Sequence, residues 1–73
     1  MIDFTPVQTV EVEARAIRVG NVVLLGPPNS PDHCTVVEAR FHDNYRVVAY
    51  IGDRGQRGEA YLRGDVKFQI VTD

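Results

Sequence analysis

The fold is decided by residues 17–25, which read Ile17-Arg18-Val19-Gly20-Asn21-Val22-Val23-Leu24-Leu25. Gly20 and Asn21 predict a tight turn, because glycine adopts positive φ without steric cost and asparagine tolerates it. The four apolar residues that follow form an unbroken run of strand length. We therefore expect a turn that leads into a buried strand, with the rest of the chain adding strands around the same core.

Chain length and charge limit the class of protein. The 73 residues are enough for one domain with a small core, over residues 1–73, in which residues 1–6 can form a flexible arm. An apolar fraction of 44% and a charged fraction of 25% are ordinary for a globular protein. A formal net charge of −2 is too balanced for a protein that coats DNA and too weakly acidic for a DNA mimic.

Cysteine usage and hydropathy indicate the compartment. The single cysteine, Cys34, cannot form an internal disulfide, which favours a reducing environment. No apolar stretch approaches the roughly 18 residues that a membrane-spanning helix needs, and the first residues lack the basic-then-apolar pattern of a secretory signal. We therefore expect a cytoplasmic protein with no membrane partner.

Alternation of apolar and polar residues predicts six short strands. The expected strands are residues 7–14, 22–25, 35–41, 45–51, 59–62 and 66–71. Residues 13–17 can instead form a helical turn, because glutamate, alanine and arginine favour helix. Turns are expected at residues 42–44, 52–58 and 63–65, and a proline-rich loop at residues 26–32.

Many short strands in a small chain require closure of the sheet to limit exposed edges. The simplest arrangement is an all-β fold, a small SH3-like, partly open barrel of five or six antiparallel strands. The alternation assigns to the core Val10, Val12, Ile17, Val22, Leu24, Val37, Ala39, Val47, Ala49, Ile51, Leu62, Val66, Phe68 and Ile70.

The segment from Val10 to Leu25 resembles the opening of small SH3-like barrels, and its turn is shared by KOW modules and by the Hint domains of inteins. Two later segments, Thr-Val-Val-Glu-Ala-Arg from Thr35 and Arg-Gly-Asp-Val-Lys-Phe-Gln-Ile-Val from Arg63, resemble strands of small uncharacterised barrel proteins of actinobacteria and their phages. Those families more often have Gly-Asp at this turn. The resemblance implies a fold that serves many functions. Hint chemistry is excluded, because it needs a nucleophile at the first residue of the domain.

His33 and Cys34 come nearest to a reactive pair. Adjacent residues of a strand point to opposite faces, so His33 is poorly placed to activate the Cys34 thiol. One cysteine with two separated histidines, His33 and His42, lacks the paired spacing of a structural zinc site. The sequence predicts no catalytic residues, no metal and no cofactor, and therefore a protein that is not an enzyme.

Arginine and tyrosine side chains supply the candidate binding surface. Arginine offers a planar fork that pairs with phosphate or carboxylate, and tyrosine can stack on a base or contact a peptide. In the alternative interpretation, the arginines of a solvated hairpin loop pair with Asp53 and Glu59, and the tyrosines are rim residues. The candidate residues are Tyr45, Tyr50, Arg54, Arg57, Tyr61 and Arg63.

These features favour a non-catalytic binding module or accessory factor, of the kind that phages encode, which recognises a protein partner through its rim or an edge strand. An alternative is binding of nucleic acid, RNA or DNA, through the loop that contains Arg54 and Arg57, as the KOW resemblance implies. A further alternative is a small structural or assembly subunit that forms a homo-oligomer through its edge strands.

Overall fold

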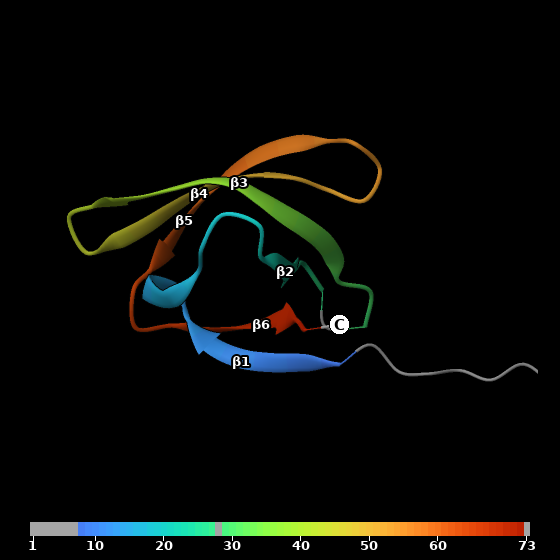
Figure 1. Cartoon of the computed structure of the whole chain (residues 1–73), viewed down its shortest axis with the longest axis horizontal. Coiled ribbons are helices and arrows are strands. Elements are labelled where there is room, and N and C mark those ends of the chain that lie inside the picture. The colour runs from blue at the N-terminus through green and yellow to red at the C-terminus, as the bar shows by residue number, and fades with distance from the viewer. Residues whose placement is uncertain (1–7, 28, 73) are drawn as a thin grey trace, which may run out of the picture.

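The computed structural model describes residues 8–27 and 29–72, so the expected arm at residues 1–6 lies outside it. Figure 1 shows one antiparallel sheet with the strand order β1-β6-β2-β3-β4-β5. The sheet is bent and not closed, which confirms the prediction of an all-β, partly open barrel. The elements are β1 (Thr9–Glu13), the 3₁₀ turn η1 (Ala14–Ala16), β2 (Val22–Leu25), β3 (Asp32–His42), β4 (Tyr45–Ile51), β5 (Arg57–Arg63) and β6 (Lys67–Val71).

The connection from β1 to β2 combines η1 with the predicted turn. Gly20 has a φ of 97°, a conformation that glycine adopts without strain. Asn21 contributes differently from the prediction, because its side-chain oxygen accepts a hydrogen bond from the Arg18 N–H at 2.7 Å. The helical alternative at residues 13–17 is correct in part, since β1 ends at Glu13 and η1 follows it.

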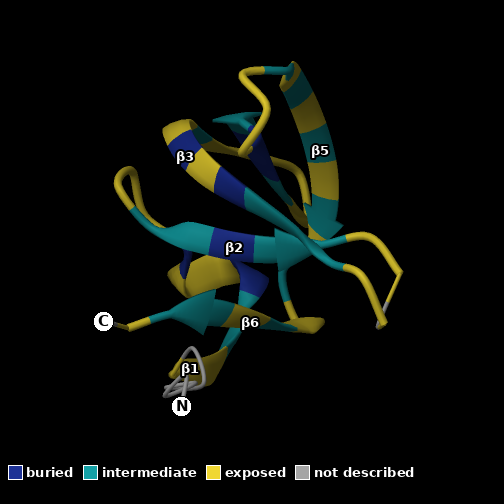
Figure 2. Ribbon diagram, turned by 90° about the vertical axis from the view of Figure 1, so that its right-hand side faces the viewer, coloured by how far each residue is buried: buried dark blue, intermediate teal, exposed yellow. Residues whose placement is uncertain are grey.

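The core lies between two parts of the bent sheet, with β3, β4 and β5 on one side and β1 and β6 on the other (Figure 1). Its fully buried members are Ile17, directly after η1, and residues of η1, β2, β3 and β4, and Figure 2 shows this burial on β2 and β3. The Arg46 side chain of β4 donates two hydrogen bonds to the Ile17 carbonyl, one of them from Nε at 3.1 Å. The central buried residues are Ala14, Ile17, Val23, Val36 and Val48.

A β-bulge at Val37 changes which side chains of β3 face the core. Val36 pairs with Tyr50 and Glu38 pairs with Ala49, so Val37 is an extra residue in β3. Val36 is therefore 1% exposed, whereas Val37, which was expected in the core, is 48% exposed. Beyond the bulge the alternation is restored, and Ala39 packs against the core, as predicted, opposite Val48.

The predicted face of β2 is also wrong. Val23, not Val22 or Leu24, is fully buried, and it lies between Cys34 of β3 and Ile70 of β6. An unbroken apolar run carries no period-two signal, so only pairing with the neighbouring strands determines which residue points inward. Two other expected core residues are exposed, Val10 in the edge strand β1 (45%) and Val66 in the turn before β6 (42%).

Candidate binding surface

The β4 strand is apolar on both faces. Val48 is part of the core and Tyr50 packs against it, so this set of alternating side chains points inward. The other set points away from the core, and we call it the outer column: Tyr45, Val47, Ala49 and Ile51. Val47, Ala49 and Ile51 were expected in the core. Val47 is fully buried, as predicted, whereas Ala49 and Ile51 are only partly buried. The prediction placed all three on the wrong face of β4, because that strand carries apolar residues at successive positions and alternation cannot select a face.

The middle of the outer column is covered by side chains of the neighbouring strands. Val47 is fully buried, and its cross-strand neighbours are Arg40 on β3 and Tyr61 on β5. Arg40 Nη1 lies 3.5 Å from Glu38 Oε1 and 3.5 Å from Glu59 Oε2. Because Glu38 and Arg40 are on β3 and Glu59 is on β5, this ion-paired group bridges across β4.

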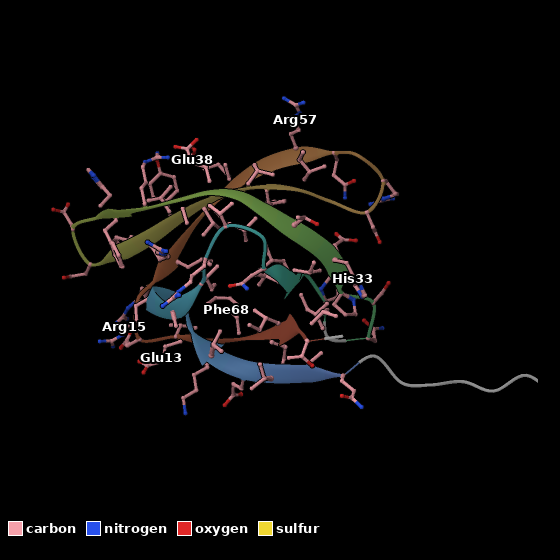
Figure 3. All side chains as sticks on the ribbon, in the orientation of Figure 1. Glu13, Arg15, His33, Glu38, Arg57 and Phe68 are labelled. Carbon is pink, nitrogen blue, oxygen red and sulfur yellow. The ribbon has the colours of Figure 1, made fainter. Side chains whose placement is uncertain are left out.

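Beside this bridge the outer face is hollowed. The hollow has a volume of about 360 Å³. The hollow lies on the same side of the sheet as the side chains of Glu38 and Arg57. Figure 3 shows both pointing away from Phe68, which lies between the two parts of the fold. We call it the outer hollow, and its lining residues are Val37, Ala49, Tyr50, Ile51, Arg57 and Gly58.

Gly58 allows Tyr50 to lie close against β5. A Cβ atom at position 58 would be only 2.5 Å from the Tyr50 hydroxyl oxygen. The Tyr50 ring therefore occupies the inner side of Gly58, where it packs against the core. Tyr50 and Gly58 form the floor of the outer hollow, while Ile51 and Arg57, which are partners in the β4–β5 register, form its wall.

The structure brings together four of the six residues predicted as a binding surface. Tyr45, Arg57, Tyr61 and Arg63 lie on the outward face of β4 and β5, where Tyr45 pairs with Arg63. Tyr61 is 58% exposed. The remaining two are elsewhere, Tyr50 on the inner face and Arg54 in the β4–β5 loop, which is held by the Gly52 N–H donating to the Gln56 carbonyl at 2.7 Å.

The predicted ion pairs of the loop arginines are absent from the described part of the chain. Among residues 8–27 and 29–72, no carboxylate lies within 4 Å of the Arg54 or Arg57 guanidinium, and Glu59 pairs with Arg40 instead. Arg63 does contact an acid, with Nε 3.6 Å from Asp65 Oδ1. Arg57 therefore lines the outer hollow as a cation that has no carboxylate partner among these residues.

A second concavity, of about 700 Å³, lies at the end of the β3–β4 hairpin. Asp43 occupies the turn with a φ of 54°, which confirms the predicted hairpin turn at residues 42–44. Phe41 is 62% exposed, and Arg46 Cζ lies 4.3 Å from the centre of its ring. The lining residues are Arg15, Phe41, Asp43, Asn44, Tyr45, Arg63, Gly64 and Asp65.

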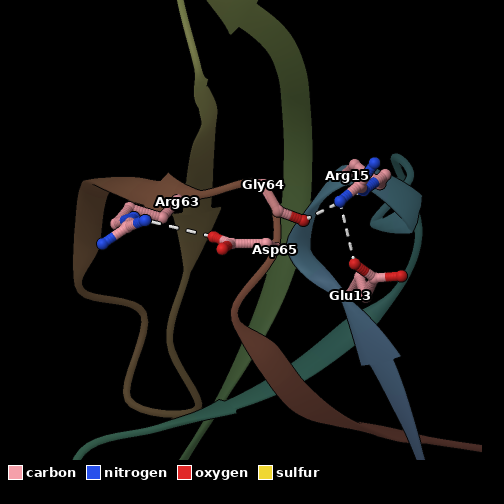
Figure 4. A network of polar contacts seen from close by, with 5 residues as sticks. All are labelled: Glu13, Arg15, Arg63, Gly64 and Asp65. Carbon is pink, nitrogen blue, oxygen red and sulfur yellow. Dashed lines mark hydrogen bonds and ion pairs between the residues drawn. The ribbon is translucent and has the colours of Figure 1, made fainter.

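The charges of this second concavity are largely paired within the protein. Figure 4 shows Arg15 donating to Glu13 Oε2 at 2.9 Å and to the Gly64 carbonyl at 3.3 Å, next to the Arg63–Asp65 ion pair. These contacts join η1 to the β5–β6 turn. The arrangement fits a structural contact between two segments better than a ligand site.

Cys34 is a buried free thiol. It pairs with Val23 on the inner face, whereas the adjacent His33 pairs with Leu24 on the outer face. Burial, with smaller contributions from Asp32 and Asp53, raises the pKa of Cys34 above its ordinary value of 9.0. No group of three or more potential metal ligands gathers in the described residues. Over the same part of the chain, no helix has the length and apolar character needed to cross a membrane.

Comparison of the chain with protein-family models, curated proteins and solved structures finds no significant match. The likeness to SH3-like barrels and KOW modules therefore stays a prediction from the residues. Sequence reasoning missed Val37, Ala49 and Ile51 as surface residues. A signal was present for Ala49 and Ile51, because residues 45–51 include apolar side chains at both odd and even positions. This pattern is typical of a strand that is covered on both faces.

Proposed function

We propose that the protein is a non-catalytic binding module that recognises a protein partner through the outward face of β3, β4 and β5. The outer column carries this proposal, since a strand that is apolar on both faces is typical of a sheet that is covered on both sides. The Arg40 bridge and Tyr61 cover only its middle. The end at Ala49 and Ile51 opens into the outer hollow.

The neighbouring strand β5 supports the same proposal. It is an edge strand, and an edge presents unpaired backbone groups to which a partner can add. Its outward residues include Arg57, Tyr61 and Arg63, and arginine and tyrosine are enriched at protein interfaces. Apolar, aromatic and cationic groups therefore lie on one continuous surface.

Site-specific photocrosslinking tests this proposal. A benzoylphenylalanine replaces Tyr61, whose exposed ring tolerates the change, and a matched control replaces Lys67 on the outward face of β6. After irradiation in a lysate of the source cell, we expect a discrete crosslinked protein from position 61 and none from position 67. Equal labelling from both positions, or none from either, contradicts the proposal. A crosslink to the same protein identifies assembly of identical subunits through this face.

A second candidate, single-stranded nucleic acid, is favoured by the alternating positions of Arg57, Tyr61 and Arg63 on one face of β5. Glu59 lies between them on the same face and weakens this case. Binding of a labelled single-stranded oligonucleotide is measured from low to high salt. Phosphate contacts require binding that is strongest at the lowest salt, so no binding there removes this candidate.

A further inference from the structure

We infer that the outer hollow receives the carboxyl-terminal residue of the partner, with an aliphatic side chain in the hollow and the terminal carboxylate on Arg57. This inference rests on the proposed function and specifies its ligand. It follows from the lining of the hollow, from the pairing of the nearby charges, and from the spacing of Ile51 and Arg57 across β4 and β5.

The side chains around the hollow select an apolar group of limited size. Val37, Ala49 and Ile51 contribute aliphatic surface, and the floor is formed at Tyr50 and Gly58. A volume of about 360 Å³ is near the lower limit of the roughly 300–1,000 Å³ of ligand pockets. The hollow therefore fits one residue of a partner better than the long apolar face of a helix.

Arg57 provides the complementary charge. Among the residues that the structure describes, it is the only charged one that lines the hollow, and it stands directly opposite Ile51 in the β4–β5 register. The two acidic residues nearest to it on this face, Glu38 and Glu59, are both held by Arg40 at 3.5 Å. A guanidinium without a carboxylate partner beside an aliphatic wall matches a carboxylate that is attached to an apolar group.

The geometry favours a terminal residue over an internal acidic one. In a terminal residue the side chain and the carboxylate share one Cα, and cross-strand neighbours such as Ile51 and Arg57 have Cβ atoms about 5 Å apart. An acidic side chain on the same face of an extended peptide is about 7 Å further along. The Arg40–Glu59 ion pair crosses the outer column next to Ala49, so polar side chains flank the hollow on that side.

The test uses an array of random octapeptides with free carboxyl termini, probed with the full chain. We expect the bound peptides to end in valine, isoleucine or leucine. Amidation of the terminal carboxylate in the same peptides should weaken binding about tenfold or more, the effect of losing a charge-assisted hydrogen bond. Arg57→Gln should cause a similar loss. Arg54→Gln is the matched control, because it removes an exposed arginine of the adjacent loop that does not line the hollow.

Two results would overturn the inference. One is binding that is insensitive both to amidation and to Arg57→Gln; if position 61 still crosslinks a partner, the proposed function survives without this ligand. The other is displacement of the peptides by octanoate at equal concentration, which would identify a small amphiphile as the ligand. If position 61 gives no crosslink and no peptide binds, the proposed function itself is rejected. Since Arg54 and Arg57 are exposed, neither variant endangers folding.

Discussion

The two ends of the sheet differ in their outward faces. At the β1–β6 end this face is polar, with Thr9 Oγ1 donating to Gln69 Oε1 at 2.9 Å and Lys67 Nζ lying 3.9 Å from Glu11 Oε1. On β4 the outward face is the apolar outer column. The inward faces of both ends are apolar, so the difference lies only on the side that the core does not use.

Apart from Val47, which is fully buried, the outward apolar residues of β4 contribute less to folding than the inward ones do. Burial of apolar surface contributes roughly 25 cal/mol per Å², and an outward side chain that stays partly exposed contributes little of that to folding. The β1–β6 end follows the pattern of an ordinary half-buried sheet. The outer column departs from it, and contact with a partner would bury the apolar surface that folding leaves exposed.

The largest expected effect comes from deleting single residues on either side of the bulge. When Val37 is deleted, Val36 and Ala39 still face inward and Glu38 still faces outward. This variant should therefore fold with a regular β3. Without Ala39, a regular β3 places Glu38 opposite the core residue Val48, and burial of that charge should cost several kcal/mol.

Circular dichroism and urea unfolding distinguish the two deletions. We expect a cooperative transition for the Val37 deletion and an unfolded or barely folded chain for the Ala39 deletion. The Val37 deletion should also lose peptide binding, because it removes an aliphatic wall of the outer hollow. If the Val37 deletion unfolds the protein while the Ala39 deletion does not, Val37 is not the extra residue of β3.

The bulge also shows what sequence can and cannot predict. Strands β1 and β6 alternate cleanly, and their inward residues Val12, Phe68 and Ile70 were predicted correctly. In residues 22–25 and 45–51 apolar side chains occur at successive positions, so the facing depends on pairing with distant strands. The outward turn of Val37 is set by the same long-range register, which no local pattern in residues 35–41 reveals.

The second prediction compares two isoleucines on opposite faces. Ile17 is fully buried in the core, whereas Ile51 is only partly buried at the outer hollow. Ile17→Ala should lower the free energy of unfolding by about 3 kcal/mol, as large-to-small changes in a core do. Ile51→Ala should cost about 1 kcal/mol or less. Equal losses in urea titrations would show that the outer column is part of the structural core.

The third prediction compares two arginines. Arg46 donates two hydrogen bonds to the Ile17 carbonyl and stacks on Phe41, so Arg46→Met should cost about 2 kcal/mol. Arg40→Met removes only the exposed bridge to Glu38 and Glu59 and should change stability by about 0.5 kcal/mol. The measurement is the urea midpoint at two salt concentrations. A larger loss for Arg40→Met would contradict the assignment of the two faces.

The candidate surface was predictable only in part, for a related reason. Period-two spacing places Arg57, Tyr61 and Arg63 on one face of a strand, so sequence alone brings these three together. It does not reveal the outer hollow, because Ile51 reads equally well as core and Val37 depends on the bulge. Tyr50 was misplaced since β4 is apolar on both faces, and Gly58 gives its ring room on the inner one.

The fourth prediction concerns adjacent positions of β3 that point to opposite faces. Cys34 is buried and its raised pKa keeps the thiol protonated, so it should react with a disulfide reagent at pH 8 only when the fold opens. A cysteine at the exposed position 35, in the double variant Cys34→Ala/Thr35→Cys, should react about a hundredfold faster if opening costs roughly 3 kcal/mol. Similar rates for the two proteins would contradict the inward position of Cys34.

Ionisation of the Cys34 thiol makes the stability of the fold decrease at high pH. The pKa of Cys34 is higher in the folded than in the unfolded chain, so the folded state holds the proton more tightly. The stabilisation that this higher pKa gives the folded state is fully present below the pKa of the unfolded thiol. It decreases as the pH rises above about 9 toward the pKa of the folded thiol. The urea midpoint should therefore fall more between pH 8 and pH 10 for the natural chain than for Cys34→Ala, because only the natural chain has this thiol to deprotonate on unfolding.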